Sequence, residues 1–202
     1  MEPRRYVLSF SYSFSAYPNR LSGNLVLDLL NVLPPSYLRG VIYTGGGTPS
    51  RALNDPNLSP LFLSLLPPLN GSDATAMSKA ALEFFDCLLA QPQELSYEDR
   101  MRALGELMLT PSSTRVVYAT VTAARDTSTF RERIKHLPVL VIQGTDDKIC
   151  DVHMYKEMMD DILSGQDYEW LWMEGVGHTP FWEKTEVHDE AVVNFVKRLT
   201  SV

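Results

Sequence analysis

The sequence predicts an α/β fold built on a small parallel sheet of three to four strands. Residues 38–44, 138–144 and 168–175 are short apolar runs rich in β-branched or aromatic residues, and glycine stops each of them. Amphipathic segments at 151–165 and 185–199 follow the second and the third run. Strands that are apolar throughout and alternate with helices are typical of a parallel sheet with crossover helices.

A further helix is expected over residues 23–35. Leucine and valine recur there at helical spacing until two prolines stop the pattern. The three glycines at 45–47 come directly after the first strand and predict a turn. They lack the Lys–Ser/Thr pair that follows a phosphate-binding loop, so the sequence does not indicate such a loop.

Residues 51–135 interrupt the alternation of strands and helices. They hold six prolines and the helical patches PLFLSLL, AMSKAALEFFDCLLA, YEDRMRALGELML and STRVVYATVTAARD, without a convincing strand pattern. A helical insertion between two strands is expected to form a lid over the carboxyl edge of the sheet. The predicted organisation is a leader at 1–22, a core made of 23–50 and 136–202, and a lid at 51–135.

The composition argues against several classes of partner. Lys and Arg number 18 against 25 Asp and Glu, a formal charge of −7 that disfavours nucleic acid and anionic membranes. No apolar run approaches the roughly 20 residues that span a bilayer, and serines interrupt the N-terminal apolar stretch, so no signal peptide is predicted. Cys87 and Cys150 have no metal-like spacing. We expect a cytoplasmic protein that binds no metal.

Two titratable residues follow consecutive strands of the predicted sheet. Asp147 stands just after the strand at 138–144, with Asp146 as the alternative acid, and His178 follows the strand at 168–175. Catalytic groups of open parallel sheets gather beyond the carboxyl ends of the strands. A carboxylate at that edge fixes the tautomer of an imidazole that acts as general base. The other three histidines are expected on the surface: His136, His153 and His188.

PVLVIQGTDDKI and MEGVGHTPFWE together resemble the last two sheet strands of the α/β-hydrolase superfamily. In that family the acid stands three residues after the strand-ending glycine, here Asp147 after Gly144, and the catalytic histidine follows a turn of small residues, here His178. GNLVLDLLNVLPPSYLRGVIYTGG resembles the segment after the nucleophile, and 51–135 resembles the helical cap. The resemblance covers roughly residues 22–202.

The resemblance implies a serine hydrolase of the esterase, lipase or epoxide-hydrolase type, with a small apolar or ester substrate selected by the lid. Such enzymes use side chains and water alone, so no cofactor is expected. The family's serine lies in G-x-S-x-G between a strand and a helix. Aligning the helix at 23–35 places Arg20 at that position, and a guanidinium cannot accept an acyl group.

Two serines are candidate replacements for the nucleophile. Ser22 lies beside the predicted helix start, where an N-cap is its competing role, and Ser11 follows the strand-like YVLSF. The leader holds neither the family's earlier strands nor its oxyanion loop, so we expect self-association through an exposed sheet edge. We also expect nil or very small hydrolysis. The alternative is a non-catalytic ligand-binding or interaction module derived from a hydrolase.

Overall fold

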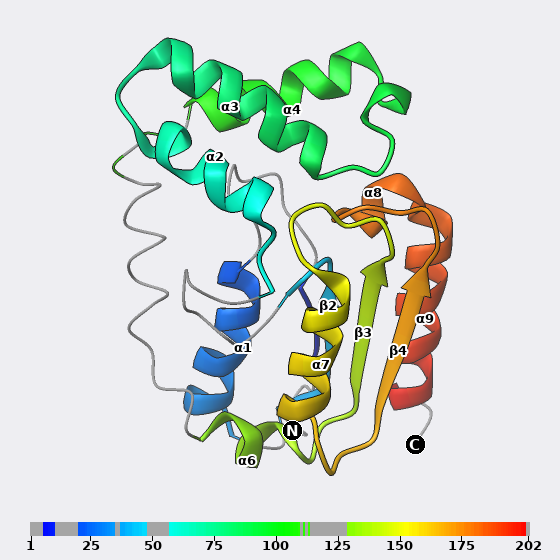
Figure 1. The fold of residues 1–202 in the computed structure, drawn as a ribbon. Helices are drawn as coiled ribbons and strands as arrows, with labels where there is room; N and C mark the ends of the chain where they lie inside the picture. The colour runs from blue at the N-terminus through cyan, green and yellow to red at the C-terminus, as the bar shows by residue number, and fades with distance from the viewer. Residues whose placement is uncertain are drawn as a thin grey trace.

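The computed structural model describes most of the chain from the first strand to the C-terminal helix. The described residues are 6–10, 20–34, 37–47, 57–109, 111, 113 and 129–200. Within these ranges side chains are described from residue 26 onward, apart from Glu106. Figure 1 shows a layered core with the strands standing upright, and a group of helices lying across its upper end.

A four-stranded parallel sheet forms the centre of the core. Its strands, in spatial order, are β1 (Tyr6–Phe10), β2 (Leu38–Thr44), β3 (Val139–Gly144) and β4 (Tyr168–Met173). The predicted α/β class and the small parallel sheet are therefore confirmed. β1 comes from the segment that the sequence predicted to be an atypical leader, and it pairs with β2 from Tyr6 to Phe10.

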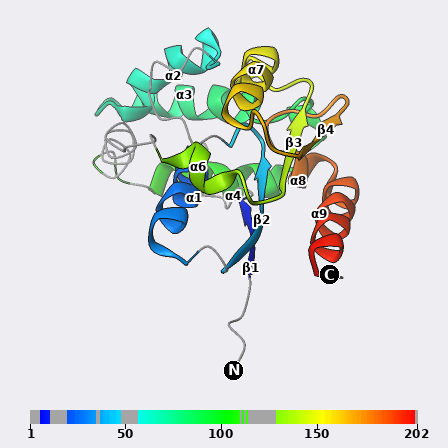
Figure 2. The same ribbon diagram turned by 90° about the horizontal axis from the view of Figure 1, so that it is seen from below.

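Helices cover both faces of the sheet, as the view from below shows (Figure 2). α1 (Arg20–Val32), α6 (Phe130–Ile134) and α7 (Val152–Ile162) pack on one face, and α9 (Thr185–Thr200) packs on the other. Alternate residues of β3 serve the two layers, because successive side chains of a strand point to opposite faces. Val139 and Val141 join the α1–α7 layer, whereas Leu140 and Ile142 join the α9 layer.

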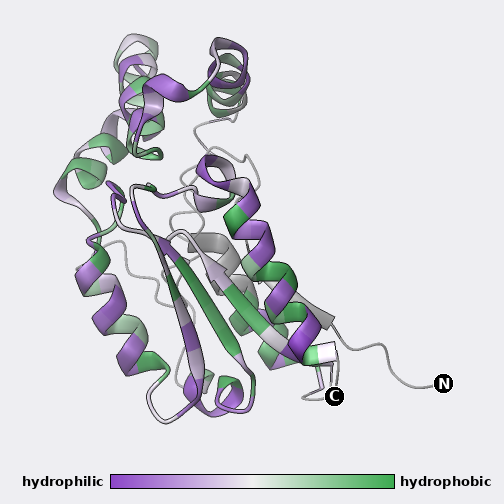
Figure 3. Cartoon of the chain, turned by 90° about the vertical axis from the view of Figure 1, so that its right-hand side faces the viewer, coloured by the Kyte–Doolittle hydropathy of each residue, from purple (hydrophilic) through white to green (hydrophobic). Residues whose placement is uncertain are grey.

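The pattern of hydrophobic residues accounts for these layers. Figure 3 shows hydrophobic residues along the middle of the sheet, and a mixture of hydrophobic and hydrophilic residues along the flanking helices. All six residues of β3 are buried. A continuous apolar run of this kind needs cover on both faces, which α7 and α9 provide.

The start of the first helix differs from the prediction. α1 begins at Arg20, three residues before the predicted start at Gly23. Ser22 therefore lies within the first turn of the helix and does not occupy the N-cap position, because the turn extends back through Arg20 and Leu21. Ser11 lies outside the described residues.

The predicted lid is helical where the structure describes it. It contains α2 (Pro60–Asn70), α3 (Ala74–Cys87), the 3₁₀ turn η1 (Pro92–Glu94) and α4 (Tyr97–Leu109). Figure 1 shows α2, α3 and α4 across the upper end of the core, with α2 above α1. They share an apolar cluster of their own, which also takes in Ile149 and Cys150 from the loop after β3. We call residues 57–109 the cap. Apart from Ser113, the predicted helical patch at 113–126 lies outside the described residues.

No helix among the described residues combines the length and the hydrophobicity that crossing a bilayer requires. β1 and β4 are the outer strands of the described sheet. Outer strands present unpaired backbone groups to further strands. Self-association through such an edge stays a prediction, and so does the cytoplasmic location.

Candidate active site

The loop after β3 holds the side chain of Asp147 in one orientation. β3 ends at Gly144, and the carboxylate Oδ1 atom of Asp147 accepts hydrogen bonds from the backbone N–H groups of Ile149 and Cys150, at 2.7 and 3.0 Å. Asp side chains in loops commonly accept hydrogen bonds from backbone N–H groups a few residues further along the chain. The carboxylate is thus fixed by its own loop before any other element contacts it.

The loop after β4 brings His178 to this carboxylate. β4 ends at Met173, and Gly175 adopts a positive φ of 68° that turns the chain back toward the sheet edge. The Nδ1 atom of His178 lies 2.6 Å from Oδ2 of Asp147, and the two side chains are 3% and 0% exposed. The structure therefore brings together the two residues that the sequence singled out.

This contact defines which ring nitrogen is available for chemistry. An ionised carboxylate only accepts hydrogen bonds, so Nδ1 of His178 carries a hydrogen and donates it to Asp147. In the neutral ring the Nε2 atom is then the basic one. A buried carboxylate that holds this tautomer also stabilises the imidazolium that forms when Nε2 takes a proton. The pair has the chemistry of a general base.

Close backbone packing fixes the distance between the two loops. The N–H of Asp146 donates to the carbonyl of Val176 at 2.9 Å, which joins the acid loop to the histidine loop. A Cβ atom at Gly144 would lie 2.2 Å from the carbonyl oxygens of both Val176 and Gly177. Only glycine allows this approach, and so the strand-ending glycine determines how near His178 comes to Asp147.

The glycine turn at 45–47 packs against the histidine ring. Gly45 and Gly46 have positive φ values of 59° and 69°, which confirms the predicted turn. A Cβ atom at Gly46 would lie 2.9 Å from Cε1 of the His178 ring and 2.7 Å from Sγ of Cys150. The sequence predicted the turn but not its contact with the ring.

The remaining sequence candidates lie away from this pair. Asp146 is exposed, and its carboxylate accepts a hydrogen bond from Thr145 Oγ1 at 2.9 Å, so it is a solvated turn residue. His136 and His153 are exposed, as predicted. The prediction for His188 is wrong, because this residue is only 4% exposed. It lies on the side of α9 that faces the end of β2, 3.4 Å from Thr44 Oγ1 and edge-on to a phenylalanine ring.

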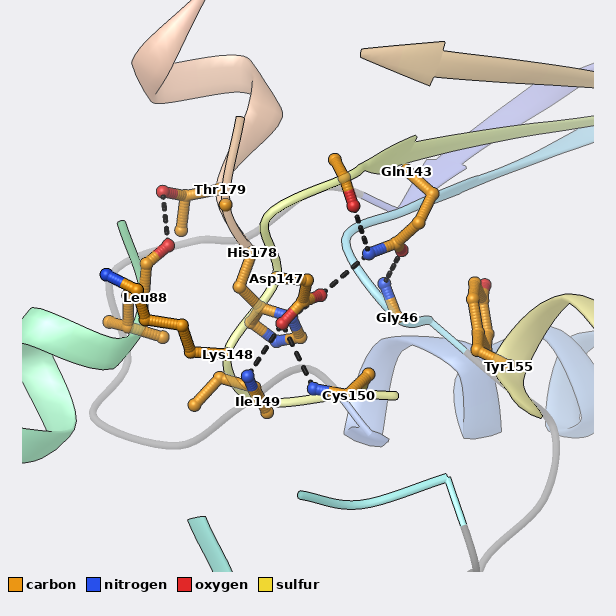
Figure 4. Close-up of polar contacts among 12 residues, drawn as sticks. Gly46, Leu88, Gln143, Asp147, Lys148, Ile149, Cys150, Tyr155, His178 and Thr179 are labelled. Atoms are coloured by element: carbon orange, nitrogen blue, oxygen red, sulfur yellow. Dashed lines mark hydrogen bonds and ion pairs between the residues drawn. The ribbon is translucent and has the colours of Figure 1, made fainter. Parts of the chain in front are cut away.

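Polar contacts join the cap directly to both loops of the pair. The carbonyl of Leu88 accepts the backbone N–H of His178 at 2.9 Å and the hydroxyl of Thr179 at 3.2 Å (Figure 4). The ammonium of Lys148, next to Asp147, donates to the carbonyls of the two residues that follow Leu88, at 3.0 and 3.1 Å. The cap segment after α3 is therefore held by the same loops that carry the acid and the histidine.

Glu183, in the short helix α8 (Pro180–Glu183), also links the cap to the histidine loop. Its Oε1 atom accepts from the N–H of Gly177 at 2.9 Å and from Thr179 Oγ1 at 3.3 Å, and its Oε2 atom accepts from the N–H of Ala90 at 2.7 Å. A pocket of about 210 Å³ lies beside it, between the cap and the histidine loop. Trp182 and Leu89 contribute to its walls, and neither residue of the acid–histidine pair lines it.

We predict that Glu183 makes the stability of the protein depend on pH. Burial raises the pKa of the Glu183 carboxyl, and its hydrogen bonds from Ala90, Gly177 and Thr179 oppose the rise. A carboxyl whose pKa is higher in the folded state stabilises the fold when protonated, and this contribution is lost as the pH rises through the folded pKa. The difference in unfolding free energy between the wild type and Glu183→Gln, measured by urea titration, should therefore fall as the pH is raised above 4.5, the ordinary pKa of a Glu carboxyl.

Glu190→Gln is the matched control, because it removes one carboxylate from an exposed position of α9. We expect the difference between wild type and this variant to change little over the same range. A difference between wild type and Glu183→Gln that grows as the pH rises would contradict the assignment.

One group of side chains in the described part of the chain has the residue types of a metal site. Ligand atoms of Asp147, Cys150 and His178 lie within 4.8 Å of one another. The donor set does not fit a metal as it stands, because both oxygens of Asp147 already accept hydrogen bonds and His178 is turned toward one of them. We derive no metal chemistry from this group.

Comparisons with known proteins concern the fold of this chain. The sequence matches no protein-family model, and it matches no curated protein. Its structure is similar to an esterase from a Rhodococcus species (TM-score 0.75, 20% identity), with 97% of this chain and 66% of the esterase covered. It is also similar to a bromoperoxidase from Bacillus anthracis (TM-score 0.72, 14% identity), with 96% of this chain and 68% of the bromoperoxidase covered. A third similar structure is a carboxylesterase from Bacillus subtilis (TM-score 0.62, 13% identity), with 96% of this chain and 60% of the carboxylesterase covered.

The chain has the α/β-hydrolase fold. At these identities the likeness concerns the fold and not the activity. The chain spans 66% of the length of the esterase, and the shared part includes a parallel sheet and its crossover helices. In this fold the strand order β1-β2-β3-β4 places the acid and histidine loops at adjacent strand ends.

Sequence reasoning missed three residues that support the pair. Lys148 and Glu183 anchor the cap, and Gln143 donates to the acid. A Glu five residues after His178 and a Gln at the end of an apolar strand were visible signals. The partners of Lys148 and Glu183 are backbone groups of the cap, and backbone groups leave no pattern in a sequence.

Proposed function

We propose that the chain carries the acid–base pair of a hydrolase acting on carboxylic esters or related bonds. Asp147 orients His178, and Nε2 of His178 takes the proton of a serine hydroxyl or a water. The observation that carries the proposal is the buried 2.6 Å contact between Nδ1 of His178 and Oδ2 of Asp147 at the ends of neighbouring parallel strands. The esterase and carboxylesterase folds support it.

The cap is proposed to be the lid that selects the substrate. It lies over the strand ends, its inner cluster is apolar, and it is hydrogen-bonded to the histidine loop through Leu88. These features suit a small apolar or ester-type substrate. The reaction needs only side chains and water, so the proposal includes no cofactor and no metal.

The nucleophile position of the proposed site holds no serine. In the α/β-hydrolase fold the serine sits where a strand turns into a helix. Here α1 begins at Arg20, and residues 18–22 read PNRLS in place of G-x-S-x-G. Because a general base without a nucleophile accelerates little, we propose that hydrolysis by the chain is nil or very small.

The test is to build the missing motif into the chain. The triple variant Pro18→Gly/Arg20→Ser/Ser22→Gly makes residues 18–22 read G-N-S-L-G. We expect a fluorophosphonate probe to label this variant at position 20, as mapped by mass spectrometry, and to leave the wild-type chain unlabelled. Adding His178→Ala should slow the labelling by about 10²-fold, because general base catalysis contributes about 10²–10⁴.

His188→Ala in the same background is the matched control, since His188 is also buried but lies away from Asp147. Labelling that does not depend on His178 would contradict the proposed role of the pair. Labelling of Ser22 or Ser11 in the wild-type chain, abolished by His178→Ala, would instead identify that serine as the nucleophile and overturn the inactive assignment.

The second candidate function is a ligand-binding module without catalysis. It is favoured by Arg20 at the start of α1 and by the pocket of about 210 Å³ between the cap and the histidine loop. This candidate predicts that a short-chain ester raises the thermal stability of the wild-type chain and is recovered unhydrolysed. Turnover of the ester would exclude it.

A further inference from the structure

A polar side chain lies in the apolar core next to Asp147. Gln143 is the last residue but one of β3 and is 0% exposed. Two and four residues earlier on the same face of the strand lie Val141 and Val139, which pack into the cluster with α1 and α7. A buried amide in such a place is costly unless its polar atoms are hydrogen-bonded.

The contacts of Gln143 satisfy its amide and define its orientation (Figure 4). Oε1 accepts the backbone N–H of Gly46 at 2.8 Å, and Nε2 donates to Oδ2 of Asp147 at 2.7 Å and to the carbonyl of Gly144 at 3.3 Å. The opposite orientation would place two oxygens against each other at Asp147 and two donors against each other at Gly46. The amide therefore points its N–H groups at the acid.

Gln143 and His178 share one oxygen of the acid. Oδ1 of Asp147 accepts two backbone N–H groups, while Oδ2 accepts Nε2 of Gln143 and Nδ1 of His178. The two donors approach Oδ2 from different elements, one from β3 and one from the histidine loop. Removing the Gln143 amide would leave only His178 to hold this oxygen.

The other end of the amide reaches the glycine turn that packs on the histidine ring. Gly46, whose N–H is held by Gln143, comes so near to His178 that a Cβ atom there would lie 2.9 Å from Cε1 of the ring. One side chain thus connects the turn after β2 with the acid after β3. Both of these elements contact His178.

We propose that Gln143 is a positioning residue of the Asp147–His178 pair, whose amide holds Oδ2 of Asp147 against Nδ1 of His178. The inference rests on the proposed general-base function, which it deepens by naming the residue that orients the acid. Gln143 contacts no reacting atom and acts through Asp147, and its hydrogen bond from Gly46 keeps the amide from rotating.

The test compares two variants with the wild type by proton NMR of the Nδ1–H group of His178, assigned with ¹⁵N-labelled histidine. Gln143→Met keeps the size of the side chain but removes both hydrogen-bonding ends. Val141→Ala is the control, because it weakens the same face of the same strand without touching the pair.

We expect the Nδ1 proton of His178 to exchange with water about tenfold faster in Gln143→Met, the size of effect that follows from losing one hydrogen bond to a charged group. In Val141→Ala the exchange should equal that of the wild type. Unchanged exchange in Gln143→Met would overturn the proposal.

The experiment separates this inference from the function that it builds on. The exchange rate is read in the protein without substrate, so an absence of hydrolysis or labelling does not alter it. In the fluorophosphonate-reactive triple variant, Gln143→Met should lower the rate of labelling without weakening reversible binding of the probe. A loss of binding with an unchanged labelling rate would indicate a purely structural role and would contradict the proposal.

Discussion

Gly144→Ala is expected to separate the acid loop from the histidine loop. The added Cβ atom would lie 2.2 Å from the carbonyl oxygens of Val176 and Gly177, and both neighbours are backbone atoms that no rotamer change can move. The hydrogen bond from Asp146 to Val176 resists a simple shift of the histidine loop. Overpacking a core typically costs about 1–3 kcal/mol. We expect Gly144→Ala to lose at least this much unfolding free energy, measured by urea denaturation.

Gly105→Ala is the matched control for this prediction. Gly105 lies inside α4, and a Cβ atom there would meet no atom from outside its own turns of the helix within 4 Å. Alanine is a better helix former than glycine, so this variant should gain about 0.5–1 kcal/mol of stability. If Gly144→Ala were as stable as the wild type, the close backbone contact between the two loops would not exist.

Asp147→Ala is expected to have the second large effect, because the carboxylate is a shared acceptor. Its removal leaves two backbone N–H groups, the amide of Gln143 and Nδ1 of His178 without their acceptor in a buried site. Leaving a buried donor unsatisfied commonly costs about 1–3 kcal/mol. Because four donors lose their acceptor, we expect a loss of at least that size in the unfolding free energy, measured by calorimetry or by urea titration.

Asp146→Ala controls for the removal of a neighbouring carboxylate. Asp146 is exposed, and among the described residues its carboxylate accepts a hydrogen bond from the hydroxyl of Thr145 alone. A surface change of this kind is expected to stay within about 0.5 kcal/mol. Equal losses for Asp147→Ala and Asp146→Ala would show that Asp147 does not hold the loop together.

The sequence predicted the elements whose pattern is continuous. β3 and β4 begin and end within two residues of their predicted bounds, because each is a single apolar run stopped by glycine. The helix after β3 was also predicted, although it ends at Ile162 and Gly165 follows two residues beyond its cap. Elements of this kind are determined by neighbouring residues, so they can be predicted without knowledge of the whole fold.

Elements that depend on distant partners were harder to predict. β1 contains a serine and lies in a serine-rich leader, so its strand pattern was weak, and its pairing with β2 is what makes it a strand. The burial of His188 depends on how α9 lies against the end of β2. The hydrogen bonds of Gln143 could not be predicted either, because they depend on how Gly46 and Asp147 approach it in the fold.

For the candidate site, the two residues predicted from the sequence are the two that meet. Asp147 and His178 were singled out because parallel strands end at one edge, and that rule needs no knowledge of side-chain packing. The cap contacts of Lys148 and Glu183 could not be predicted, since their partners are carbonyl and N–H groups of the main chain. Main-chain partners depend on the path of the cap.

The most direct test of the central claim, that Asp147 fixes His178 as a general base, is the tautomer of the His178 ring. It is measured by ¹⁵N NMR of the neutral imidazole in the wild type and in Asp147→Asn. The structure predicts that the wild-type ring carries its hydrogen on Nδ1. The resonance of this proton should lie downfield, and the proton should exchange slowly with water. In Asp147→Asn the amide of the new side chain would face the ring as a donor, so the hydrogen should move to Nε2. A wild-type ring protonated on Nε2, or a tautomer unaffected by Asp147→Asn, would contradict the account.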